Sequence, residues 1–112
     1  MNRVHQGYEE VDMARMESIV LRYQIFRDDI AYWYRDCRDD IADNDYHRED
    51  IDDKYKYFRE DITDWSKSAK EETKSEVLLK EIDTKCKSLL EEVDTKYKSL
   101  LEKIGCKKMA AK

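Results

Sequence analysis

The sequence predicts an all-α protein: a long amphipathic helix with 11-residue repeats that assembles as a coiled coil, a helical bundle or a filament. The 112 residues contain no Pro and two Gly, and 44% of them are charged. Globular domains average about 25% charged residues, with Gly near 7% and Pro near 5%. Apolar residues also recur at steps of three and four, which is the spacing of one helix face. A short charged motif returns at a nearly constant interval, which is typical of repeat architectures.

The only two glycines, Gly7 and Gly105, lie near the two ends of the chain. No Gly or Pro therefore favours a turn between them. A continuous helix from about Tyr8 to Ile104 would be ~145 Å long at a rise of 1.5 Å per residue. Such a rod cannot fold back to bury its own apolar stripe, so we expect it to need partners.

The chain divides by composition into five segments. The aromatic residues and the acids concentrate in the first half, whereas Leu and Lys concentrate in the second. The polar stretch between the halves is either a hinge or continuous helix, because all its residues are compatible with a helix. The segments are a lead-in (1–7), an aromatic-rich acidic helical segment (8–65), the polar stretch (66–76), a Leu/Lys-rich helix on the 11-residue repeat (77–104) and a C-terminal tail (105–112).

The repeat is visible as recurring short motifs. Arg-Asp-Asp-Ile or Arg-Glu-Asp-Ile occurs at 27–30, 38–41, 48–51 and 59–62, and 82–91 returns in similar form as 93–102. Eleven residues span three turns at 3.67 residues per turn, so a bundle on this repeat runs nearly straight or coils gently to the right. One unit, 38–47, has only 10 residues, and Asn44 falls where the stripe expects an apolar side chain. This unit predicts a kink, a short break or a polar core position.

The apolar stripe is the expected association surface between helices. Near 19–21, 25–26 and 32–34 the apolar surface is wider than one stripe, which favours a bundle of three or more helices or a second partner surface. The predicted association residues are Ile19, Tyr23, Phe26, Ile30, Trp33, Ile41, Ile51, Tyr55, Phe58, Ile62, Trp65, Leu79, Ile82, Leu89, Leu90, Val93, Tyr97, Leu100, Leu101 and Ile104.

No catalytic, cofactor or metal site is expected. The paired carboxylates recur with the repeat and belong to a solvated face with ion pairs four residues apart. Asp43 and His47 are spaced to share a metal on a helix, but no third ligand is apparent. Cys37 and Cys86 lie on the stripe as small core residues, and Cys106 is expected to be exposed. A rod offers no concave pocket, so the chain is not expected to be an enzyme.

The spacing of apolar anchors in 25–33 and 57–65, each ending in Trp, resembles the helical repeats of centrosomal fibre proteins that bind centrins. The resemblance covers these two short stretches. It implies a helix held in the groove of an EF-hand partner.

These features favour a structural or interaction protein that self-associates into a bundle, fibre or filament, with itself or other helical proteins as partners. The alternatives are reversible binding to a lipid surface through the Leu/Lys helix and service as a helical target of an EF-hand protein. A net charge of −5 argues against nucleic acid, and the acidic first half does not favour a membrane surface. The absence of an apolar leader and the odd number of Cys favour an intracellular, cytoplasmic location.

Overall fold

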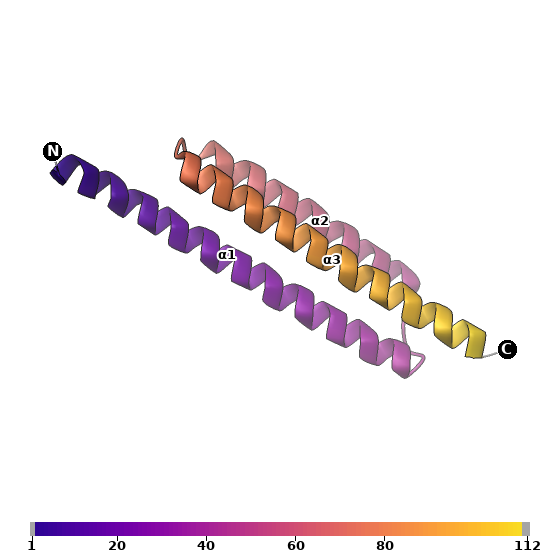
Figure 1. The fold of residues 1–112 in the computed structure, drawn as a ribbon. Helices are drawn as coiled ribbons and strands as arrows, with labels where there is room; N and C mark the ends of the chain where they lie inside the picture. The colour runs from indigo at the N-terminus through magenta and orange to yellow at the C-terminus, as the bar shows by residue number, and fades with distance from the viewer. Residues whose placement is uncertain (1, 111–112) are drawn as a thin grey trace.

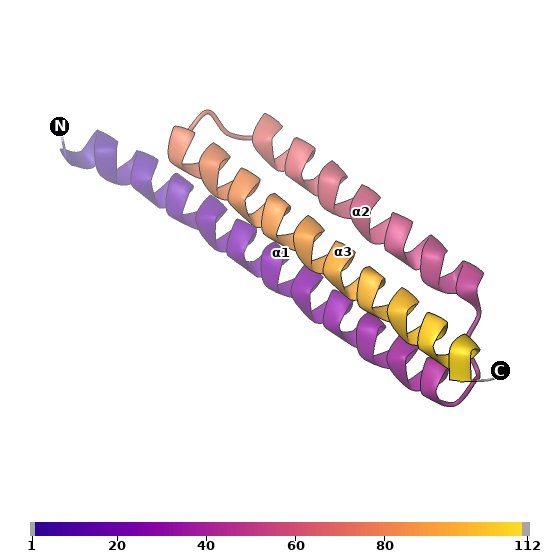
Figure 2. The same cartoon turned by 45° about the vertical axis from the view of Figure 1, so that its right-hand side comes forward.

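A computed structural model describes the backbone of residues 2–110 and the side chains of residues 12–107. It contains three helices, α1 (Asn2–Ala42), α2 (Arg48–Glu71) and α3 (Glu76–Ala110). The helices lie side by side, with α1 and α3 parallel and α2 antiparallel to both (Figures 1 and 2). The bundle measures 73 × 18 × 16 Å. The all-α prediction is confirmed for the described residues.

The prediction of one long rod is wrong. The chain reverses twice, at 43–47 and at 72–75, so that its own helices cover the apolar stripe. The second turn lies inside the polar stretch 66–76. The first lies in the 10-residue unit that interrupts the repeat.

The first turn is a Schellman motif built around Asn44. Its φ of 58° is in the left-handed region, which Asn tolerates better than most residues. The N–H of Asn44 donates to the Ile41 carbonyl at 3.1 Å, and the N–H of Asp45 donates to the Asp40 carbonyl at 2.8 Å. These are the two bonds that close a helix at a left-handed residue. The missing residue and the misplaced Asn of the sequence therefore mark a turn.

The second turn starts α3 with a side-chain cap. The Ser75 hydroxyl accepts a hydrogen bond from the N–H of Leu78, and the N–H of Ser75 bonds to the Thr73 hydroxyl at 3.1 Å. Ser is among the favoured N-cap residues because its oxygen satisfies a helix N–H that has no intrahelical partner. Glu76 follows in the first turn, where a negative charge is favourable.

The core runs along the whole bundle and draws on all three helices. In α3 its members repeat at intervals of 11, as Leu78, Leu89 and Leu100 and as Ile82, Val93 and Ile104. Burying each such side chain contributes about 1.5–3 kcal/mol. The buried residues from α1 and α2 are Ile19, Phe26, Ile30, Trp33, Ile41, Ile51, Phe58, Ile62 and Ser66.

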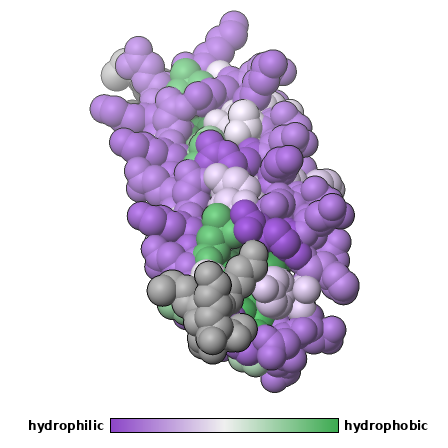
Figure 3. Space-filling view, turned by 90° about the vertical axis from the view of Figure 1, so that its right-hand side faces the viewer, coloured by the Kyte–Doolittle hydropathy of each residue, from purple (hydrophilic) through white to green (hydrophobic). Residues whose placement is uncertain are grey.

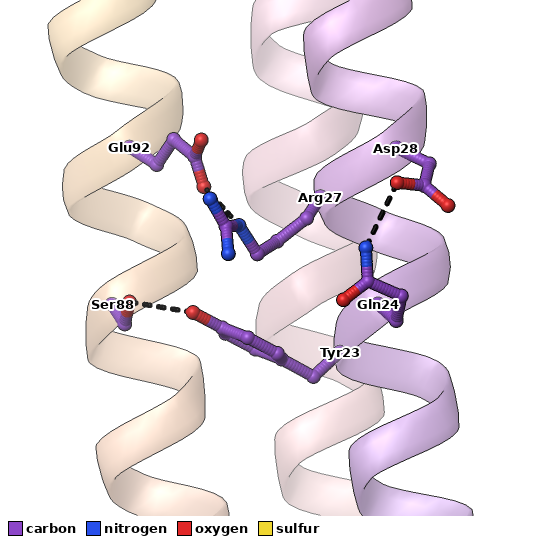
Figure 4. Close-up of polar contacts among 6 residues, drawn as sticks. All are labelled: Tyr23, Gln24, Arg27, Asp28, Ser88 and Glu92. Carbon is purple, nitrogen blue, oxygen red and sulfur yellow. Dashed lines mark hydrogen bonds and ion pairs between the residues drawn. The ribbon is translucent and has the colours of Figure 1, made fainter.

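Polar contacts align α1 with α3. The Tyr23 and Ser88 hydroxyls lie 3.1 Å apart, and one helical turn further Arg27 pairs with Glu92 at 3.3 Å (Figure 4). Both pairs are separated by the same number of residues along the chain, as expected for parallel helices in register.

The α2–α3 interface has its own polar network. The rings of Tyr55 and Tyr97 stack with centroids 3.9 Å apart. The Tyr55 hydroxyl donates to Asp94 at 2.7 Å, and the Tyr97 hydroxyl donates to Asp52 at 2.5 Å. Each hydroxyl thus crosses to a carboxylate on the other helix, which fixes the stagger of the antiparallel pair.

Candidate interaction groove

A groove separates α1 from α2, because large aromatic side chains hold these two helices apart. The rings of Phe26 and Trp65 lie 6.0 Å apart between centroids, and those of Trp33 and Phe58 lie 5.5 Å apart. In contrast, α3 contacts both other helices along their length, and it lies between them in Figure 2. The aromatic pairs therefore form a floor between α1 and α2, with open space above it.

The larger cavity in this groove has a volume of about 580 Å³ and lies near the first turn. Its apolar lining includes Phe26, Trp33, Ile51 and Phe58, and no residue of α3 takes part. Carboxylates surround this apolar lining, whereas Lys54 supplies a positive charge. The acids are Asp29, Asp36, Asp40, Asp45, Asp50 and Asp61. Seen from the end that carries this turn, hydrophilic side chains cover most of the bundle and hydrophobic ones show in seams between them (Figure 3).

The crowded carboxylates change the titration of their neighbours. Partial desolvation, together with repulsion from Asp36 and Asp45, raises the pKa of Asp40 above its usual range. Desolvation by burial, followed by the negative charges of Asp36 and Asp40, raises the pKa of the Cys37 thiol to about 11. Cys37 is therefore a neutral thiol at physiological pH, which suits a packing role and not a nucleophile.

Trp33, which contributes to the cavity lining, carries a buried polar atom without a partner in the described part of the chain. Its side chain is only 6% exposed, and its Nε1 is buried with no hydrogen-bond partner among the described residues. A buried N–H without a partner costs about 1–3 kcal/mol.

A second cavity, of about 430 Å³, continues the groove toward the other end of the bundle. Here α1 contributes Arg15, Ser18 and Arg22, while α2 contributes Asp64 and other polar residues. Arg15 donates a hydrogen bond to the carbonyl of Glu72 across the groove. The groove face of α1 is therefore positive in its first half and negative in its second.

Exposed apolar side chains share one face of α1, and one of them, Tyr32, lines the larger cavity. On α1, Leu21 is 63% exposed, Ile25 41% and Tyr32 64%, and they are spaced by four and seven residues on one face. On α2, Tyr57 is 57% exposed and lines the larger cavity. These α1 residues are the extra apolar width seen in the sequence beside the main stripe.

The predicted association residues lie mainly inside the chain. All except Leu79, which is half-buried, belong to the two core clusters or pack against them. Helices of the same chain cover them in this structure. The sequence reading missed the polar groove residues Arg22 and Asp29, because charged residues beside a stripe look like an ordinary solvated face.

The structure also locates the metal and EF-hand candidates of the sequence. Asp43 and His47 lie at the first turn, and no group of three or more potential metal ligands comes together among the described residues. The EF-hand anchor candidates Phe26, Trp33, Phe58 and Trp65 pair with one another across the groove floor. Within the described helices, no stretch is both long and apolar enough to cross a lipid bilayer.

No protein family, curated protein or solved structure matches this chain.

Proposed function

We propose that this protein is a structural or interaction protein that self-associates, and that the α1–α2 groove is the surface it uses. The observation that carries the proposal is the second apolar face of α1. Leu21, Ile25 and Tyr32 remain exposed beside the groove although the chain has already completed a core along its whole length. A fourth helix placed against this face would cover it and would extend the bundle as a coiled-coil-like assembly.

The groove also combines the elements typical of a helix-binding surface. It has an aromatic floor, two cavities that side chains can enter and charged edges. Recognition of an amphipathic helix uses apolar anchors at helical spacing against such a groove. The proposed role is non-enzymatic.

The two alternatives from the sequence receive less support. Lipid binding needs the apolar face of 77–104, but Ile82, Leu89 and Val93 are buried in the core. Lys85 and Lys96 of the Leu/Lys-rich helix lie over tyrosine rings of α1. An EF-hand partner would have to pull the paired aromatic anchors out of the groove floor. Both roles would require the bundle to open first.

The test is the mass of the protein in solution, measured by sedimentation equilibrium over a range of concentrations. We expect a mass above that of one chain that rises with concentration. Ile25→Asp places a charge on the apolar face and should return the mass to one chain. Val77→Asp is the matched control, because Val77 is an exposed apolar residue (69%) on α3 and does not belong to the apolar face of α1.

A wild-type mass of one chain at every concentration would overturn the proposal. An equal loss of association in both variants would also overturn it, since the effect would then not depend on the groove. Circular dichroism of each variant establishes that the helices are retained.

A further inference from the structure

We infer that the occupant of the groove is a second copy of this chain, whose α1 runs antiparallel to the first α1 about a two-fold axis near Ile25 and Phe26. This inference rests on the proposed self-association and specifies its geometry. The order of residues and charges along the groove face of α1 supports this pairing.

The groove face of α1 is complementary to itself when reversed. Starting from the proposed axis and moving toward the N-terminus, it presents Arg22, Ser18 and Arg15; moving toward the C-terminus, it presents Asp29, Trp33 and Asp36. Counted in residues from the axis, the three positions on one side lie at the same distances as the three on the other side. In an antiparallel pair, Arg22 of one copy thus lies opposite Asp29 of the other, Ser18 opposite Trp33, and Arg15 opposite Asp36.

The charges favour this orientation over the parallel one. Antiparallel pairing brings each Arg to an Asp, and the two-fold axis repeats both pairs. Parallel pairing in register brings Arg22 to Arg22 and Asp29 to Asp29. Opposite charges of this kind add little affinity when exposed, but they select orientation and register.

The two cavities of the groove fit the same arrangement. Arg15, Ser18 and Arg22 line the smaller cavity, and Asp29, Trp33 and Asp36 line the larger one. The antiparallel pair places the smaller-cavity half of each copy over the larger-cavity half of the other. Ile25 lies at the axis, flanked by Leu21, so the centre of the contact is apolar.

The existing contacts of the arginines are compatible with this pairing. Arg15 donates to the Glu72 carbonyl, and the Arg22 guanidinium lies 5.9 Å from the centre of the Phe26 ring. A guanidinium carries five N–H donors, so each Arg can keep its present contact and also reach a carboxylate.

The pairing predicts a closed dimer. From Arg15 to Asp36 the contact is ~32 Å long at 1.5 Å per residue. Both copies use the same face, which makes the interface isologous, and an isologous interface closes after two subunits. A filament would need a second, different surface.

Reversal of the central charges tests the geometry. Arg22→Asp alone places an acid of each copy opposite Asp29 of the other copy. Asp29→Arg alone places a base of each copy opposite Arg22 of the other copy. We expect each variant to have the mass of one chain at concentrations where the wild type has the mass of two. An equimolar mixture of the two variants should recover the mass of two chains, as should the double variant R22D/D29R.

Glu91→Arg is the matched control, because Glu91 is exposed on α3 and lines neither cavity of the groove. It should keep the wild-type mass. Circular dichroism and thermal unfolding of each variant separate a lost interface from a lost fold.

The outcomes distinguish this inference from the proposed function. If the wild type has the mass of one chain at every concentration, both the proposed self-association and the antiparallel pairing are overturned. A wild type of two chains whose mass is unaffected by the single reversals, or single variants that fail to recover on mixing, overturns the antiparallel pairing and leaves self-association standing. A mass that keeps rising beyond two chains overturns the closed dimer in the same way.

Discussion

The hydroxyls of Tyr34 and Ser99 lie 3.0 Å apart, and the contact repeats that of Tyr23 and Ser88 eleven residues earlier in both helices. A lysine accompanies each tyrosine, with Lys85 over the Tyr23 ring and Lys96 over the Tyr34 ring. Two copies of one contact at a fixed chain separation set the alignment of α1 and α3.

Removal of one of these hydroxyls should destabilise the bundle modestly. Tyr34→Phe and Tyr23→Phe each lose one hydrogen bond, which contributes about 0.5–1.5 kcal/mol to the free energy of unfolding. The two sites are ~16 Å apart along the helix, so the losses should add in the double variant. Urea unfolding followed by circular dichroism measures them.

Tyr32→Phe is the control, because Tyr32 is exposed and its hydroxyl has no hydrogen-bond partner among the described residues. It should leave the unfolding free energy within about 0.5 kcal/mol of the wild type. Equal stabilities of the Tyr34→Phe variant and the wild type would show that the hydroxyl contact does not support the alignment.

The first turn should depend on the backbone conformation of residue 44. Asn44 has a φ of 58°, and its side-chain oxygen accepts a hydrogen bond from Lys107 at 3.0 Å. Asn44→Ala and Asn44→Gly both lose that bond, but only Ala pays for a left-handed conformation, at about 1–2 kcal/mol. Part of this difference is offset by the greater chain entropy that Gly loses on folding.

Thermal unfolding of the two variants at one concentration measures the difference. We expect Asn44→Ala to unfold at a lower temperature than Asn44→Gly. The reverse order would mean that residue 44 does not hold the left-handed conformation in solution.

Asp52 should make stability depend on acid pH. Its carboxylate accepts hydrogen bonds from the Tyr97 hydroxyl and from Arg48, which lower the pKa of Asp52, although desolvation opposes them. A lowered folded-state pKa stabilises the fold above the unfolded-state value of about 3.9. This stabilisation is lost as the pH falls from there through the folded-state pKa.

Urea unfolding at steps from about pH 7 to pH 2.5 spans this transition. Asp52→Asn should be less stable than the wild type at neutral pH and should lose less stability on acidification. Asp53→Asn, an exposed neighbour, should follow the wild-type curve. The prediction fails if the Asp52→Asn and wild-type curves stay parallel across the acid range.

Much of the helical structure could be predicted from the residues. Steps of three and four placed Ile30, Ile62 and Leu89 each on the apolar face of its own stretch of helix, and all three are fully buried. The periodicity works because a helix repeats every 3.6 residues whatever covers the face. The candidate groove was visible only as extra apolar width near Ile25, since its charged residues have no sequence signature of their own.

The sequence by itself determined the helical character, the buried face and the two places where the repeat fails. Only the tertiary structure decided that both failures are turns, and that the face is covered by the same chain. The physical reason is that periodicity states which side of a helix must leave water, but not which helix covers it. That choice depends on the left-handed turn at Asn44 and the cap at Ser75, which allow α2 and α3 to return along α1. The spacing of α1 and α2 by paired aromatic rings, and with it the groove, exists only once these three helices are packed.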